Sequence, residues 1–381
     1  MGDTQKHTKP NVPNLRFPGF EGEWKQHLLS EYLDFKNGLN PSAKSFGEGI
    51  KFISVMDILN NPFITYDCIR ASVNATEKEK QEFNVEYGDI LFQRSSETLE
   101  DVGHANVYLD SRTALFGGFT IRGKKKGVYN PLFFKYLLDS PTARKKVIVK
   151  GAGAQHFNIG QEGLSKVVLS FPSIQEQNRI AVFMNLLDQR IAIQNKVIEK
   201  YESLIKALAF KIIGKNLPNT TLSECVKCSS SILKESDLAG AGRVPSYGAS
   251  GISGFTDNAL SPGDSILVTK DGSGIGTLRY VHGSHSFVGT LNSMTPKDGV
   301  YLPYIFYALQ NVGFERYRTG QAIPHIYFKD YGKEAIYCPS FDDQKRLAKV
   351  LEMIDAKIGI ERANLKILQS LKAYLLSTMF I

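Results

Sequence analysis

The chain has 381 residues, which is too long for one ordinary hydrophobic core and indicates two or three domains. Hydrophobic residues make up 42% and charged residues 22%, a globular balance, and the longest apolar runs are too short to span a membrane. The net charge of +8 favours an acidic partner such as nucleic acid.

The first domain is expected to cover residues 1–174. Its first 13 residues are polar with no apolar stretch behind them, so they predict a flexible leader rather than a signal peptide. Further along, a Gly-Asp turn at 88–89 leads into an apolar β run. "NPLFF" predicts a helix that Asn130 caps and Pro131 starts. The domain is therefore mixed, mostly β with short helices.

A long helix is expected at residues 175–214. The stretch 175–213 contains no proline or glycine and would span roughly 55–60 Å at 1.5 Å per residue. Apolar residues recur with the 3.5-residue period of a coiled-coil seam, which the polar residue Gln194 interrupts. The residues of this seam are Ile191, Ile198, Tyr201, Ile205 and Leu208.

The second half of the chain repeats the first, with a second domain at 215–340 and a second long helix at 341–381. "PSIQEQNRIAVFMNLLDQRI" at 172–191 and "PSFDDQKRLAKVLEMIDAKI" at 339–358 share seven of twenty residues, without a gap, at an offset of 167. The second seam consists of Ile358, Leu365, Leu368 and Leu375, and Glu361 takes the place of Gln194. The sequence thus predicts an α+β protein with two pseudo-repeated β-rich domains and two long helices.

Shorter segments extend the repeat upstream of the helices. "HLLSEYLDF" at 27–35 matches "TTLSECVKC" at 220–228, and "GVYNPLFFKYLL" at 127–138 matches "GVYLPYIFYALQ" at 299–310. Just before each long helix, a Gly-x-x-x-x-His loop runs from Gly151 to His156 and from Gly320 to His325. The scaffold is therefore expected to repeat while its loops differ.

Motifs for catalysis or metal binding are missing. The glycine-rich stretches of the second domain lack the lysine of a phosphate-binding loop, and "NPF" at 61–63 lacks the double proline of adenine methyltransferases. Cys225 and Cys228 form one CxxC without the second pair that a structural zinc site needs. The four scattered cysteines predict a reduced, cytoplasmic protein, and no enzyme activity or metal is expected.

Basic and polar loops are the strongest functional signal. Lysine and arginine neutralise phosphates, while serine, asparagine, glutamine and arginine read base edges. For any single run, such as "GKKKG", a solvated surface remains the simpler interpretation. The candidate DNA-binding residues are Arg94, Ser95, Ser96, Lys124, Lys125, Lys145, Lys150, Gln155, His156 and Asn158 in the first domain, and Ser246, Tyr247, Lys270, Ser273, Arg316, Arg318, Gln321, His325 and Tyr327 in the second.

The chain resembles the specificity subunit of a Type I restriction–modification system. The resemblance rests on the two helix starts "PSxxxQxRIA" and "PSxxxQxRLA", on "PNLRFPGFEGEWKQHLLSE" at 13–31 and on "TGQAIPHI" at 319–326. It implies that each domain recognises one half of a split, asymmetric DNA sequence and that the helices pack antiparallel as a spacer. It also implies that two methyltransferase subunits dock on the spacer and that restriction subunits join them.

The resemblance assigns all catalysis to those partners. S-adenosylmethionine, ATP and magnesium would be used by the partner subunits, and this chain would bind no cofactor. Two other interpretations stay open on the residues alone: a divergent, self-contained DNA methyltransferase, and a helical scaffold without DNA specificity.

Overall fold

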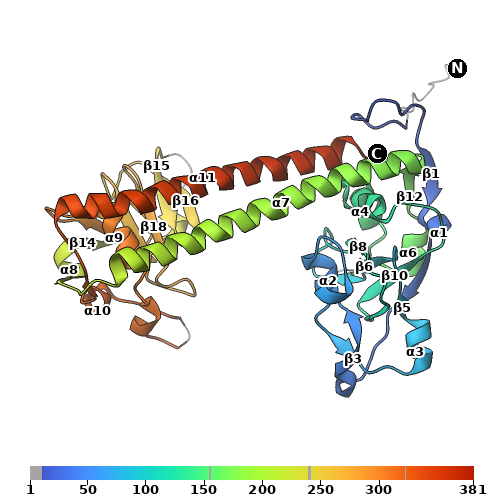
Figure 1. Ribbon diagram of the computed structural model, residues 1–381, viewed down its shortest axis with the longest axis horizontal. Helices are drawn as coiled ribbons and strands as arrows, with labels where there is room; N and C mark the ends of the chain where they lie inside the picture. Colours follow the sequence, from blue (N-terminus) through green and yellow to red (C-terminus); the bar gives the residue numbers. More distant parts are fainter. Residues whose placement is uncertain (1–10, 154–155, 239–241, 322) are drawn as a thin grey trace. The chain divides into compact units, whose positions relative to one another are not determined.

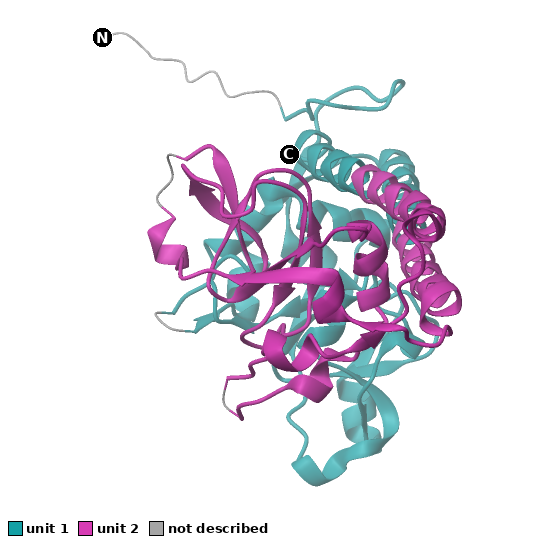
Figure 2. Cartoon of the chain, turned by 90° about the vertical axis from the view of Figure 1, so that its left-hand side faces the viewer, with its two compact units in different colours: residues 1–193, 365–381 teal, residues 194–364 magenta. Residues whose placement is uncertain are grey.

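The structure, a computed structural model, describes residues 11–153, 156–238, 242–321 and 323–381. The chain divides into two compact units, residues 1–193 with 365–381 and residues 194–364 (Figure 2). Each unit contains one β-rich domain and a part of both long helices. The division therefore lies inside the helices, whereas the expected boundaries lie where the helices begin. No helix within the described residues is long and apolar enough to cross a membrane.

The first unit is built on a four-stranded antiparallel sheet with the order β2-β10-β6-β8 (Figure 1). Its strands are β2 (Leu33–Asn37), β10 (Thr120–Lys125), β6 (Ile90–Gln93) and β8 (Ala105–Val107). Helix α4 (Pro131–Asp139) packs on this sheet, and it begins as expected with the Asn130 side chain accepting a hydrogen bond from the Phe133 amide. Phe92, Phe133 and Phe134 are fully buried in the resulting core.

A second sheet in this unit has the order β4-β3-β9-β5, and its strands β3 and β9 are parallel. These strands are β4 (Ser72–Val73), β3 (Phe46–Ile53), β9 (Ala114–Phe116) and β5 (Asn84–Val85). Two strand pairs complete the unit, β1 (Lys25–Leu28) with β12 (Val168–Phe171) and β7 (Ser95–Ser96) with β11 (Phe157–Asn158). The short helices are α1 (Leu29–Tyr32), α2 (Val55–Asn60), α3 (Glu77–Glu82), α5 (Pro141–Ile148) and α6 (Gln161–Ser165).

The second unit repeats this plan. Its antiparallel sheet has the equivalent order β14-β20-β17-β18, with strands β14 (Val226–Ser230), β20 (Leu291–Pro296), β17 (Ser265–Thr269) and β18 (Leu278–Val281). The smaller sheet has the order β16-β15-β19 and again contains one parallel pair, β15 (Val244–Gly248) with β19 (Ser286–Phe287), beside β16 (Gly251–Thr256). The remaining elements are β13 (Thr220–Thr221), β21 (Ala335–Ile336), α8 (Leu222–Cys225), α9 (Leu302–Leu309) and α10 (Phe328–Tyr331).

The two long helices are α7 (Ile174–Ala209), which continues as the π-helical turn η3 (Phe210–Gly214), and α11 (Phe341–Thr378). They run antiparallel: in the first unit Lys372 Nζ lies 2.6 Å from the Asp188 carboxylate, and in the second the Gln194 amide donates to the main-chain oxygen of Glu361 at 3.1 Å. Gln194 thus meets its own repeat equivalent. All nine expected seam residues are buried or half-buried.

A buried glutamine fixes the start of each long helix to its domain. The side-chain oxygen of Gln177 accepts the Asn130 amide at 3.0 Å, and Gln344 accepts the Tyr301 amide at 2.8 Å. The amide nitrogen of each glutamine donates to the carbonyl of the proline that precedes its helix, at 3.1 and 2.8 Å. Each glutamine therefore bridges the first turn of the long helix to the first turn of α4 or α9.

A tyrosine of α4 or α9 makes a second attachment to the same long helix, further along both helices. The hydroxyl of Tyr136 donates to Asp188 and that of Tyr307 donates to Asp355, both at 2.9 Å. Burial raises the pKa of both tyrosines, so they remain protonated donors. These contacts make Tyr136 the equivalent of Tyr307. Aligning the two shared "GVY" segments would instead pair Tyr136 with the next residue, Ala308.

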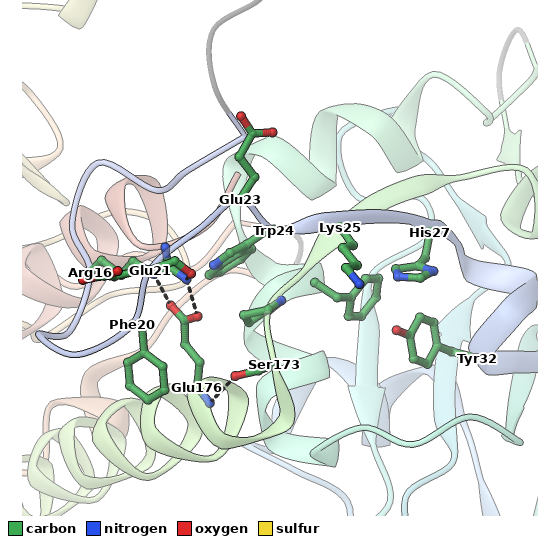
Figure 3. A pocket seen from close by; sticks show the side chains of 12 residues that line it. Arg16, Phe20, Glu21, Glu23, Trp24, Lys25, His27, Tyr32, Ser173 and Glu176 are labelled. Carbon is green, nitrogen blue, oxygen red and sulfur yellow. Dashed lines mark hydrogen bonds and ion pairs between the residues drawn. The ribbon is translucent and has the colours of Figure 1, made fainter.

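The N-terminal segment of the first unit holds the other side of α7. Both oxygens of the buried Glu176 accept hydrogen bonds from the Arg16 guanidinium, at 2.8 and 2.7 Å (Figure 3). Trp24 packs edge-on against Phe133 and Phe380, which joins this segment to α4 and to the residues that follow α11. The residues that carry the "RFPGFEGEW" resemblance therefore have a structural role in this unit.

Candidate nucleic-acid interface

In the first unit, β7 and β11 form a short ribbon that brings two of the predicted loops together. Arg94 is fixed on both sides, because its amide donates to the Phe119 carbonyl and its own carbonyl accepts the Ile159 amide, each at 2.9 Å. Across the ribbon, the Ser95 hydroxyl donates to the Asn158 side-chain oxygen at 2.5 Å. The ribbon thus holds one cation beside a pair of neutral polar groups.

The second unit has the same network with different side chains. The Lys270 amide donates to the Thr290 carbonyl, and the Lys270 carbonyl accepts the Ile326 amide, again at 2.9 Å each. Across from it, His325 Nδ1 lies 2.7 Å from the Asp271 carboxylate. Arg94 and Lys270 therefore occupy equivalent positions, and we call them the node cations.

The expected match of Gly151 and His156 with Gly320 and His325 is wrong by two residues. Main-chain hydrogen bonds close the first loop between residues 152 and 158 and the second between 319 and 325. This register matches Gly153 with Gly320, which both have positive φ angles, and Asn158 with His325. The offset of 167 therefore holds without a gap from residue 152 to the end of α7.

The lysines of "GKKKG" lie away from the ribbon. Lys124 and Lys125 are the last two residues of β10, and Lys125 lies roughly 17 Å along the strand from Thr120, which pairs beside Arg94. Lys124 Nζ lies 3.6 Å from the Glu86 carboxylate, and Lys125 Nζ lies 4.9 Å from the centre of the Tyr129 ring.

The remaining candidates of the first unit lie in β7 or follow α4. Lys145 is exposed on α5, while Lys150 is exposed two residues before the closure of the ribbon loop. His156 is exposed in the loop that leads into β11, and Ser96 pairs with Phe157 in the ribbon. Gln155 lies outside the described residues. Lys150 is thus the lysine of this group that lies nearest the ribbon loop in sequence.

In the second unit, two arginines near the pairing of Asp271 with His325 lie close to carboxylates. Arg316 pairs with Glu334, whose hydrogen bond raises the pKa of Arg316, and its guanidinium lies 5.1 Å from the centre of the Tyr317 ring. Arg318 lies 3.7 Å from Glu315. These partners reduce the positive charge that either arginine offers to phosphate. Ser273 is exposed in the loop after Asp271, Gln321 is exposed in the loop closed between residues 319 and 325, and Tyr327 is exposed just after that loop.

Ser246 does not belong to the candidate interface. It is 0% exposed, and its hydroxyl has no hydrogen-bond partner among the described residues. The glycine-rich sequence suggested a surface loop, but β15 is the central strand of its sheet, which buries alternate side chains. The neighbouring Tyr247 is half-buried. The centre of its ring lies 5.9 Å from the centre of the His285 ring and 5.9 Å from Arg279 Cζ.

The search for polar and basic residues missed Phe119 and Thr290. They occupy equivalent exposed turns, and each accepts the amide of a node cation. The signal was present in "FGGFT" and "FVGTL", which share a phenylalanine and a glycine at matching places, but the equivalence emerges only from the strand register.

No group of three His, Cys, Asp or Glu side chains within the described ranges could hold a metal ion. His285 is buried and lies 2.7 Å from the Ser265 hydroxyl, while the exposed His282 lies 3.0 Å from Asp264. A hydrogen bond with Cys338 lowers the pKa of the Cys225 thiol. The HxxH and CxxC patterns thus belong to local hydrogen-bonding groups.

The chain thus has a duplicated β-rich domain and a duplicated long helix, the architecture of a DNA-specificity protein to which partner subunits supply catalysis. The family described as "Type I restriction modification DNA specificity domain" matches residues 21–203 and 220–370, and the chain belongs to this family. It is a Type I restriction–modification specificity subunit. The self-contained methyltransferase and the scaffold without DNA specificity are therefore set aside.

Two curated relatives are similar over much of the chain. The putative type I specificity subunit S.MgeORF438P of Mycoplasma genitalium is 25% identical over 273 residues, which cover 65% of this chain and 70% of the relative. The putative type I specificity subunit S.MpnORF638P of Mycoplasma pneumoniae is 26% identical over 275 residues, which cover 65% and 72%.

Two solved structures show the same fold. The crystal structure of the Type-I restriction–modification S subunit from M. genitalium superposes with a TM-score of 0.62 at 19% identity, covering 97% of this chain and 99% of that one. A chain from a study of assembly and conformational transition of the type I system superposes with a TM-score of 0.55 at 15% identity, covering 95% and 98%.

Proposed function

We propose that each unit binds one half of a bipartite, asymmetric DNA site through its ribbon. The observation that carries this proposal is the pair of node cations, which the same main-chain hydrogen bonds hold at equivalent positions. A cation at a fixed position suits a phosphate contact, because phosphates are the same in both half-sites.

The neighbours of the node cations would then read the bases. Ser95 and Asn158 offer neutral donors and acceptors, whereas Asp271 and His325 offer a carboxylate and an imidazole at the equivalent positions. A carboxylate accepts from amino groups such as cytosine N4, while asparagine can bind adenine through both of its polar atoms. Different neighbours beside a constant cation would give the two units different half-sites.

We further propose that two methyltransferase subunits dock on the long helices. Each unit exposes an apolar patch, and the two patches consist of repeat-equivalent residues between 38% and 67% exposed. The residues are Phe183, Leu186 and Ile193 in the first patch and Val350, Met353 and Ile360 in the second. Steps of three and seven residues place each set on one helix face, and equal patches suit two copies of one partner.

The division of chemistry follows from this assembly. S-adenosylmethionine would be used by the methyltransferase subunits, and ATP and magnesium by the restriction subunits, with no cofactor held by this chain. The complex would act in the cytoplasm, where its DNA lies.

The node cations provide the test of DNA recognition. Arg94→Ala and Lys270→Ala are each measured in the methyltransferase complex by fluorescence anisotropy, on duplexes in which either half-site is intact or scrambled. Because a phosphate contact does not read bases, each variant should lose affinity by a similar factor on every duplex, and the slope of log K against log salt should fall by about one.

Lys125→Ala is the matched control, since Lys125 is a half-buried lysine whose ammonium lies over the Tyr129 ring. An Arg94→Ala variant whose loss of affinity depends on the base sequence of a half-site, or that leaves the salt slope unchanged, contradicts the assignment of Arg94 to a phosphate contact.

A further inference from the structure

An uncharged, apolar cavity lies beside the ribbon of the first unit. Its volume is about 530 Å³, and the apolar side chains that line it include Leu39, Phe46, Phe52, Val55, Met56 and Phe119. Three of them are open to solvent, Phe119 at 71%, Met56 at 61% and Phe46 at 46%. Apolar side chains grouped in this way on a surface mark a binding site more often than chance exposure does.

The turn that carries Phe119 is firmly held. The Gly117 amide donates to the Ile53 carbonyl at 3.0 Å, and the Gly117 carbonyl accepts both the amide and the hydroxyl of Thr120, at 2.9 and 2.7 Å. The Arg94 amide binds the Phe119 carbonyl, and its guanidinium donates to the Gly118 carbonyl at 3.3 Å. The main chain that carries the exposed Phe119 ring is therefore held in direct contact with the node cation Arg94.

The second unit has the same turn without the ring. The Val288 amide donates to the Tyr247 carbonyl at 2.9 Å, and the Val288 carbonyl accepts the Leu291 amide at 3.0 Å. These bonds match those of Gly117, so the exposed Thr290 stands in the place of Phe119. The chain thus keeps the cation and the turn in both units and changes the side chain between them.

We infer that Phe119 and the adjoining cavity receive the C5-methyl group of a thymine in the first half-site. The inference rests on the proposed function, because it takes Arg94 as a phosphate contact. The thymine methyl is the apolar group that bases present in the major groove, and phenylalanine is among the side chains that contact it. No charged residue lines the cavity among those described, so it offers no partner for a base amino group other than a few neutral oxygens.

Uracil replaces thymine without its methyl group and tests this contact directly. The intact methyltransferase complex is titrated with cognate duplexes that carry uracil at one thymine position at a time. Wild type should lose about fourfold to tenfold in affinity at one position of the first half-site, as expected for one buried methyl group. Phe119→Thr should bind the thymine and uracil duplexes equally.

Thr290→Ala is the matched control and should keep the uracil penalty of the first half-site. A penalty that persists in Phe119→Thr, a first half-site without a sensitive thymine, or a uniform loss of affinity in that variant on every duplex overturns the inference. The last result would indicate a ring wedged between base pairs. Failure of the proposed function is separate, since it appears as absent specific binding of wild type to unmodified DNA.

Discussion

Gln177 and Gln344 show how much one side chain can determine. Each is buried and satisfies two main-chain groups outside the helical hydrogen-bond ladders, the carbonyl of the proline before its own helix and the amide of the residue that caps a neighbouring helix. Replacing such a residue leaves a buried donor and acceptor unpaired. Such unpaired groups cost more than an average hydrogen bond contributes.

Gln177→Ala should lower the free energy of unfolding by about 1–3 kcal/mol. Trp24 is the only tryptophan in the chain and lies in the core of the first unit, so urea unfolding followed by its fluorescence reports that unit. Gln344→Ala is the matched control, because it removes the equivalent bonds of the second unit. Equal shifts of the tryptophan transition in both variants would show that the bonds do not act locally.

At the scale of elements, a polar contact interrupts the apolar seam between α7 and α11. The Gln194 amide binds the carboxylate of Glu361 at 2.5 Å and its main-chain oxygen at 3.1 Å, and Lys357 lies 2.7 Å from the same carboxylate. The pKa of Glu361 is lowered, chiefly by Lys357 and then by Gln194. The contact breaks an otherwise apolar seam, which is a common way to fix the register of paired helices.

Gln194→Leu alone should therefore destabilise the protein by about 1–3 kcal/mol, because it leaves the Glu361 carboxylate against an apolar neighbour. Adding Glu361→Leu should restore the thermal midpoint to wild type or above, since two leucines complete the seam. Differential scanning calorimetry of the single and double variants measures this coupling. Additive losses would contradict it.

The sequence predicted the elements better than it predicted their alignment. Long helices and their 167-residue offset were evident because periodicity and repetition are local properties of the chain. The predicted alignment of the two ribbon loops is wrong by two residues. Their register depends on hydrogen bonds to distant parts of the chain, such as the bond from the Ile159 amide to the Arg94 carbonyl. Ser246 was misplaced for the same reason, because nothing local shows that β15 is a central strand.

At the scale of the whole molecule, the internal repeat predicts how many methyltransferase subunits bind. Two equal apolar patches predict two equal partners, so each patch should account for one methyltransferase subunit. The patches lie on the helices rather than on the ribbons. Substitutions in the patches should therefore leave the DNA-reading residues in place.

Leu186→Asp should reduce the assembly to one methyltransferase subunit per chain, because a carboxylate in an apolar contact costs several kcal/mol. Met353→Asp should do the same, and the double variant should bind none. Native mass spectrometry counts the subunits. Asn195→Asp, on the opposite face of α7 and exposed, is the control and should keep both. Loss of both subunits through one substitution would refute independent docking.

The contact between Gln194 and Glu361 also has a consequence for symmetry. A residue meets its own equivalent only on a two-fold axis, so this part of the chain reproduces within one molecule the isologous contact of a homodimer. A dimer of two first halves would place two neutral amides on that axis, and a dimer of two second halves would place two carboxylates there. The unlike pair gains a hydrogen bond that two repelling carboxylates cannot make, so the axial position itself disfavours the association of two second halves.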